Sequence, residues 1–266
     1  MMKKIKEFYK TESKATLVVY IVLRALVIAC LILETLRGNW GNACLCVLTL
    51  ILYLIPYYID TKLKIDLPSV LDILIFLFIF SAEILGEIQN FYGVFKHWDT
   101  ILHTINGFLC AAIGFSLIDI LNRSDKVKIN LSPIFVAVVA FCFSMTVGVL
   151  WEFFEFGMDT YFRTDMQKDR VLQSISSVEL NPKHENVPII LNNIDQSTIY
   201  YHNKDGELVS QIIDGGYLDL GIIDTMKDLL VNFIGAVVFS IFGFLYIKNR
   251  DQYHFVGHFI PRKKRA

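Results

Sequence analysis

The residues best suited to chemistry in this chain are ionisable side chains that occur in pairs within otherwise apolar stretches. The four pairs are Glu83 and Glu87, Asp99 and His103, Glu152 and Glu155, and Asp224 and Asp228. A spacing of three or four residues places both members of a pair on the same face of a helix. An acidic group at the centre of a membrane helix costs about 2.5–3.5 kcal/mol on insertion scales, so such residues are candidates for function.

Seven carboxylates and one imidazole cannot all carry charge side by side in a medium of low dielectric constant. Either several pKa values are strongly raised, as in a proton relay, or a bound cation compensates the charge. Carboxylate oxygens suit Mg²⁺, Ca²⁺ or Mn²⁺, and an imidazole nitrogen also admits Zn²⁺. The predicted metal ligands are the carboxylates of the last two pairs: Glu152, Glu155, Asp224 and Asp228. His103 is then a general acid or base, and Asp99 orients its ring.

Other polar or small residues near these pairs complete the predicted pocket. They are Asn106, Gly107, Asn232, Asp165 and Gln167, together with Glu83 and Glu87.

Structural roles explain some of the same residues equally well. Asp224 and Asp99 also fit helix N-caps, and His103 taken alone also fits a structural histidine. Glu83 and Glu87 also fit residues that reach toward water at the membrane interface. The remaining three, Glu152, Glu155 and Asp228, resist a structural explanation better because aromatic and aliphatic residues flank them.

The elements that must position these residues are membrane-spanning helices. Of the 266 residues 54% are hydrophobic and 19% are charged, whereas about 25% are charged in an average soluble domain. Six apolar stretches approach the ~20 residues that cross a bilayer, and they cover 15–36, 40–58, 69–90, 99–121, 132–156 and 224–247. This pattern predicts an all-α polytopic membrane protein and excludes a disordered chain, a disulfide-rich scaffold and an ordinary soluble globule.

Prolines mark several ends of these spans. Pro68 after Asp66-Leu67, and Pro133 after Ser132, predict a cap followed by proline in the first helical turn. Pro56 predicts a bend or an end in the second span.

Positive charges predict which way the spans face. With a cytoplasmic N-terminus, the inner segments 1–14, 60–67, 121–130 and 248–266 hold 16 Lys and Arg residues and the outer segments hold seven. The third and fifth spans then run outward and end in their pairs, whereas the fourth and sixth run inward and begin with theirs. All four pairs are therefore predicted in the outer leaflet. A formal net charge of −1 shows no nucleic-acid footprint. The six spans make the lipid bilayer the expected partner.

The outer loop 157–223, which separates spans 15–156 from span 224–247, is predicted to carry a small β-hairpin or meander. Its segments 187–194, 197–202 and 207–213 are β-prone, and Asn203-Lys204-Asp205-Gly206 supplies a turn between the last two. All five cysteines lie within spans, so no disulfide framework is expected in this loop.

The polar motifs resemble those of known membrane proteins. Asp99-x3-His103, the acidic residues of 151–155 and Asp228-x3-Asn232-x2-Gly235 are similar to the sparse pattern of VanZ-like proteins. The chain more closely resembles the YjdF-like membrane proteins of unknown function, in which an Asp-Thr-x-x-Asp run opens the last helix, as 224–228 does here. The resemblance covers roughly residues 99–246. The long insertion between Gln167 and Asp219, and the pair Glu83 and Glu87, depart from the pattern.

The resemblance implies a bacterial plasma-membrane protein of the cell envelope whose polar site faces outward. We expect six spans with both termini cytoplasmic, and a pocket that binds a cation and through it an envelope lipid or glycan head group. In an enzymatic form, the reaction expected is phosphoester hydrolysis or transfer on a lipid head. One alternative is a proton- or cation-coupled transporter, which predicts polar residues continuing inward past Asn106, Asn232 and Ser240. Another is a non-catalytic sensor or partner-binding protein that works through its β insertion.

Overall fold

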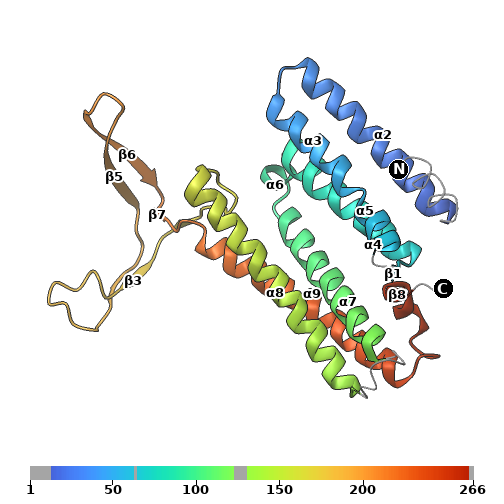
Figure 1. Ribbon diagram of the computed structural model, residues 1–266. Coiled ribbons are helices and arrows are strands. Elements are labelled where there is room, and N and C mark those ends of the chain that lie inside the picture. Colours follow the sequence, from blue (N-terminus) through green and yellow to red (C-terminus); the bar gives the residue numbers. More distant parts are fainter. Residues whose placement is uncertain (1–12, 63–64, 123–130, 264–266) are drawn as a thin grey trace. The chain divides into compact units, whose positions relative to one another are not determined.

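The computed structural model describes residues 13–62, 65–122 and 131–263, which fold mostly as helices (Figure 1). Within these ranges six helical segments are long and apolar enough to cross a membrane: Lys14–Leu36, Trp40–Lys62, Ser69–Ile88, Trp98–Asp119, Pro133–Phe162 and Ile222–Lys248. The predicted all-α polytopic fold is confirmed, with shifts of a few residues at the span ends. Most of the predicted cytoplasmic segments 1–14 and 121–130, and the end of the 248–266 tail, lie outside the described residues.

The chain divides into two compact units, Met1–Val149 with Asp228–Ala266, and Leu150–Lys227. The first unit contains α2 (Lys14–Leu36), α3 (Trp40–Leu52), α4 (Ile55–Lys62), β1 (Ile65–Asp66), α5 (Ser69–Ile79), the π-helix η1 (Phe80–Ile88), α6 (Phe91–Val94), α7 (Trp98–Asn122), most of α8 (Pro133–Gly157) and of α9 (Ile222–Lys248), η3 (His254–His258) and β8 (Arg262–Lys263). The boundary between the units falls within α8 and α9.

Helices α2, α3 and α5 pack side by side around an aromatic cluster (Figure 1). The ring centroids of Tyr20 and Phe76 lie 5.3 Å apart, and those of Tyr53 and Phe76 lie 5.4 Å apart. Val27 and Cys46 are fully buried beside them. These side chains form the core that holds the first three spans together.

Helices α7, α8 and α9 pack around a second core of small and aromatic residues. Its fully buried members are Ala111, Ala112, Phe115, Val136, Ala140, Ala236 and Phe239. Small residues let helix backbones approach closely, which is how helices associate where lipid removes the hydrophobic driving force. After α9 the chain folds back against this core through Val256 and Ile260, and β8 pairs antiparallel with β1.

The proline predictions are confirmed at two sites and corrected at one. The Ser132 hydroxyl accepts a hydrogen bond from the Phe135 backbone N–H (3.3 Å), and Pro133 opens α8. Helix α3 ends at Leu52 because Pro56 has no N–H to donate to the Leu52 carbonyl, and α4 begins after a turn. Pro68, however, is the N-cap residue itself and does not lie in the first turn of α5, because Asp66 is held in β1 by its pairing with β8.

The second unit carries η2 (Met158–Phe162), β2 (Val171–Leu172), β3 (Ile175–Ser177), β4 (Ile189–Leu191), β5 (Gln196–His202), β6 (Leu208–Asp214) and β7 (Tyr217–Leu218). Strands β5 and β6 form the predicted hairpin. In its turn, Gly206 adopts φ +81°, and the Asn203 Oδ1 atom accepts hydrogen bonds from the backbone N–H groups of Asp205 and Glu207, both at 2.9 Å. Strand β4 lies within the predicted β-prone segment 187–194, whereas its pairing with β3 and the pair β2–β7 were not anticipated from the sequence.

Candidate functional site

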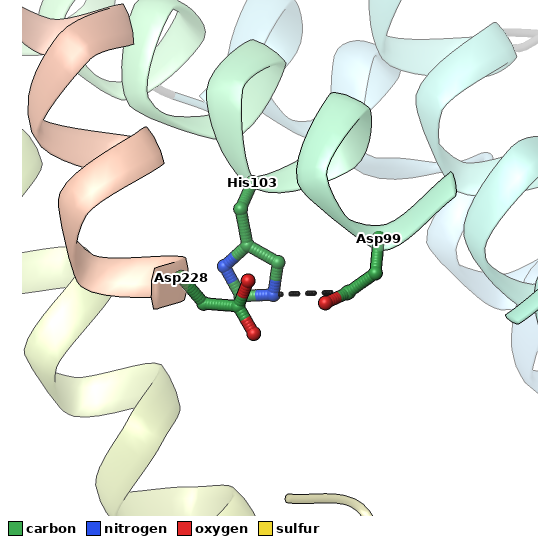
Figure 2. A group of neighbouring side chains, drawn as sticks. All are labelled: Asp99, His103 and Asp228. Carbon is green, nitrogen blue, oxygen red and sulfur yellow. Dashed lines mark ion pairs between the residues drawn. The ribbon is translucent and has the colours of Figure 1, made fainter. Parts of the chain in front are cut away.

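Three side chains from α7 and α9 converge in the first unit: Asp99, His103 and Asp228 (Figure 2). One potential ligand atom from each lies within 4.8 Å of the other two. The Nε2 atom of His103 is 3.4 Å from Oδ1 of Asp99, and Asp228 reaches toward the imidazole from α9. Asp228 is only 2% exposed. Two of the four sequence pairs thus contribute to one site, and no other group of three or more acidic, histidine or cysteine side chains meets this closely in the described ranges.

Glycines at the crossing of α7 and α9 bring the two helices close enough for this contact. A Cβ atom on Gly107 would lie 2.1 Å from the backbone oxygen of Asn232, and one on Gly235 would lie 2.1 Å from the backbone oxygen of Thr104. Neither distance is compatible with a side chain, so glycine is needed on both helices. The predicted pocket residue Gly107 therefore acts through packing.

A hydrogen-bonded carboxamide pair lies next to the three side chains along the helices. The Asn106 Nδ2 atom donates to Oδ1 of Asn232 (3.3 Å), and Nδ2 of Asn232 donates to the backbone oxygen of Ser144 (3.5 Å). The Ser144 hydroxyl in turn donates to the backbone oxygen of Gly107 (2.7 Å). Asn106 and Asn232, both predicted pocket residues, therefore contact each other, and Ser144 is a partner that sequence reasoning missed.

Aromatic rings replace polar groups further along the same interface. The Phe108 and Phe239 ring centroids lie 5.0 Å apart, those of Phe115 and Phe239 lie 5.9 Å apart, and both Phe115 and Phe239 are fully buried. Beyond the asparagine pair, packed aromatic rings therefore fill much of the α7–α9 contact.

Asp224 anchors a loop to the start of α9 in the second unit. Its Oδ2 atom accepts a hydrogen bond from the Lys168 backbone N–H (3.1 Å), and its Oδ1 atom lies 3.7 Å from Nη2 of Arg170 and 3.9 Å from Nζ of Lys227. Close by, Gln167 donates through Nε2 to the Thr225 hydroxyl (2.6 Å). These contacts agree with a structural role for Asp224 at the beginning of the helix.

The same loop is held by two aspartates that the sequence did not single out. The Asp159 carboxylate accepts hydrogen bonds from the backbone N–H groups of Met166 (2.7 Å) and Gln167 (2.8 Å). The Asp219 carboxylate accepts them from Arg170 (2.7 Å) and Ile223 (3.0 Å). Burial raises the pKa of Asp219, but these backbone donors outweigh it and hold the pKa below its usual value. Met166, Gln167 and Arg170 lie seven or more residues from the aspartates that they contact, so no local motif marks these hydrogen bonds.

The other predicted site residues occupy separate places. Glu152 and Glu155 are buried in the second unit, and Nε1 of Trp151 donates to Oε1 of Glu155 (2.9 Å). Asp165 is exposed and lies 3.6 Å from Nζ of Lys168. Glu83 and Glu87 lie on η1, half-buried and exposed respectively, and do not join the Asp99–His103–Asp228 group.

Comparison with known proteins identifies a family. A family model described as "Predicted membrane protein (DUF2238)" matches residues 15–249. No curated protein and no solved structure matches the chain significantly.

Proposed function

The chain belongs to the DUF2238 family of membrane proteins, and we propose that it binds a divalent cation through Asp99, His103 and Asp228. The observation that carries the proposal is the approach of three potential ligand atoms from two helices to within 4.8 Å of one another. Two carboxylates lie beside one imidazole, and the carboxylate of Asp228 is almost fully buried, where negative charge is poorly solvated. A bound cation offsets that charge and so stabilises the close approach of these side chains.

The donor set favours Zn²⁺ or Mn²⁺ over Mg²⁺ and Ca²⁺. One imidazole nitrogen with two carboxylate oxygens suits borderline cations, whereas Mg²⁺ and Ca²⁺ prefer oxygen throughout. Ligand atoms that bind Zn²⁺ at about 2.1 Å are at most about 4.2 Å apart. The observed limit of 4.8 Å therefore requires only a small rotation of one side chain on binding.

A cation held by three protein ligands keeps coordination positions open for a further ligand. We assign these positions to the phosphate of an envelope lipid or glycan head group, which a divalent cation binds well. The excess of positive charge in the inner segments supports a bacterial plasma-membrane protein with cytoplasmic termini and an outward-facing site. The VanZ-like and YjdF-like motifs around Asp99 and Asp228 support the same assignment.

An alternative enzymatic form leaves the cation to Asp228 and not to His103, which instead moves a proton while Asp99 orients its ring. The 3.4 Å separation of Nε2 and Oδ1 supports that pairing. The other predicted ligands, Glu152, Glu155 and Asp224, lie in the second unit. The aromatic contacts of Phe239 with Phe108 and Phe115 favour a site that opens to one side over a transport path along the α7–α9 interface.

Isothermal titration calorimetry of the detergent-purified protein with Zn²⁺, Mn²⁺, Mg²⁺ and Ca²⁺ tests the proposal. We expect one site for Zn²⁺ or Mn²⁺. We expect Asp228→Asn to weaken it by more than about 100-fold, because partners outside the ligand shell alone are worth 10–100-fold. Asp205→Asn, which removes an acid from the hairpin turn, is the matched control and should bind as the wild type does. Equal affinities for Asp228→Asn and the wild type, or no binding by the wild type, would contradict the proposal.

A further inference from the structure

The asparagine pair beside the candidate site links the two helices that supply its ligands. Asn106 lies three residues after His103 on α7, and Asn232 lies four residues after Asp228 on α9, so each shares a helix face with a ligand. Their 3.3 Å hydrogen bond joins these faces directly. Asn232 is 1% exposed, which makes its carboxamide one of the most deeply buried polar groups in the first unit.

The packing around Asn232 leaves its side chain little freedom. A Cβ atom on Gly148 of α8 would lie 2.7 Å from Nδ2 of Asn232. Gly107 of α7 meets the Asn232 backbone oxygen in the same way, at 2.1 Å. Glycines on two neighbouring helices thus make the space that Asn232 fills. An amide held in this way fixes the position of α9 along its axis relative to α7 and α8.

The hydrogen bonds of the pair indicate positioning and not metal ligation. The Oδ1 atom of Asn232 already accepts from Asn106, and Oδ1 of Asn106 accepts from the Cys110 thiol (3.5 Å). Each amide oxygen, which is the atom of an asparagine that binds cations, already accepts one hydrogen bond within the protein. Both amide nitrogens, which cannot ligate, serve as donors only.

We propose that the Asn106–Asn232 pair positions Asp228 against His103 and so sets the cation affinity of the site without contacting the cation. The proposal rests on the cation-binding function proposed above. Without the pair, α9 loses a polar attachment to α7 next to the ligands, and the remaining amide is left without its partner in the packed helix contact. The ligand atoms then separate.

Two substitutions of similar volume test this role by calorimetry. Asn232→Leu removes every hydrogen bond, and we expect the Zn²⁺ or Mn²⁺ dissociation constant to rise by at least about tenfold, as for other positioning partners of a metal site. Asn232→Asp keeps the Oδ1 acceptor for Asn106, and we expect it to retain most of the affinity. Ser240→Leu is the matched control, because it also replaces a buried polar residue of α9 but faces the apolar groove formed with α8. A merely structural role would lower the unfolding temperature of Asn232→Leu and leave its dissociation constant at the wild-type value, which would overturn the proposal.

A cross-linking experiment separates this proposal from the cation proposal. In a chain whose native cysteines are replaced, with serine at Cys110 to keep a donor for Asn106, the pair His103→Cys and Asp228→Cys should be linked by a short bifunctional thiol reagent, detected by peptide mass spectrometry. We expect added Asn232→Leu to slow this cross-link at least about tenfold in rate, and Ser240→Leu to leave it unchanged. If Asn232→Leu slows the cross-link but the wild-type protein binds no cation in calorimetry, cation binding is refuted and the positioning role is upheld. An unchanged rate would refute the positioning role whatever the cation result.

Discussion

Replacing Gly107 by alanine tests the helix contact that brings Asp228 to His103. The new Cβ atom would lie 2.1 Å from the Asn232 backbone oxygen, whereas real Cβ atoms essentially never come within 3.0 Å of a neighbour. The two backbones must therefore move apart by about 0.9 Å, which is the difference between these distances. The same movement lengthens the Nδ2–Oδ1 distance between Asn106 and Asn232, which is now 3.3 Å, and so breaks their hydrogen bond.

The size of the effect follows from the packing. Overpacking a tight contact costs about 1–3 kcal/mol, and each kcal/mol lowers the unfolding temperature of a protein of this size by about 2–4 °C. The better helix propensity of alanine offsets about 0.5–1 kcal/mol of that cost. We therefore expect Gly107→Ala to unfold a few degrees lower, at most about 10 °C, and to bind the cation at least about tenfold more weakly.

Thermal unfolding in detergent with and without Zn²⁺ or Mn²⁺ measures both effects together. Gly243→Ala on α9 controls for a clash, because its Cβ atom would lie 2.7 Å from the Phe115 ring and away from the site. Gly41→Ala on α3 controls for helix propensity, since its nearest neighbour would be at 3.7 Å. If Gly107→Ala binds the cation as tightly as Gly243→Ala does, the close approach of α7 and α9 does not assemble the site.

Three further outcomes are expected in the second unit. Because the folded-state pKa of Asp219 lies below its unfolded value of about 3.8, its carboxylate stabilises the start of α9 above that pH and ceases to do so as the pH falls through the lower folded value. Hydrogen exchange at the Ile223 amide should therefore accelerate at low pH, and Asp219→Asn should show the fast rate already at neutral pH. Asp159→Ala should make the segment 163–170 a preferred site of limited proteolysis, because each hydrogen bond to a charged group is worth about 1.5–3 kcal/mol; unchanged cleavage would contradict this. Replacing residues 197–213 by two glycines should leave the unfolding temperature of the membrane-spanning helices unchanged, because β5 and β6 pair only with each other among the described strands; a large decrease would assign the hairpin a role in stabilising them.

The spans and the hairpin could be predicted from sequence because their signals are local. Apolar runs of bilayer length leave the backbone no alternative to a helix, and Asn203 followed by Gly206 specifies its turn within a few residues. The N-cap position of Pro68 and the hydrogen-bond partners of Asp159 could not be predicted. The first accompanies the pairing of β1 with β8, and the second joins a loop to η2, and neither contact produces a periodic pattern in the sequence.

The candidate site could be predicted in its residue types but not in its grouping. Helical spacing places Asp99 beside His103, and this follows from sequence alone. The approach of Asp228 depends on Gly107 and Gly235, whose role is visible only once α7 and α9 are packed together. A glycine in an apolar span indicates a close helix contact without naming the partner helix.

The most direct test of the central claim is the thermal unfolding of the detergent-purified protein in EDTA and in Mg²⁺, Mn²⁺, Ca²⁺ or Zn²⁺, for the wild type and for Asp228→Asn. A ligand at 100 times its dissociation constant adds about 2.7 kcal/mol of stability, which corresponds to about 5–10 °C for a protein of this size. Cation binding at Asp99, His103 and Asp228 predicts a rise of this order with Zn²⁺ or Mn²⁺ in the wild type that Asp228→Asn abolishes. An unfolding temperature insensitive to all four cations, or a rise that persists in Asp228→Asn, would contradict the account.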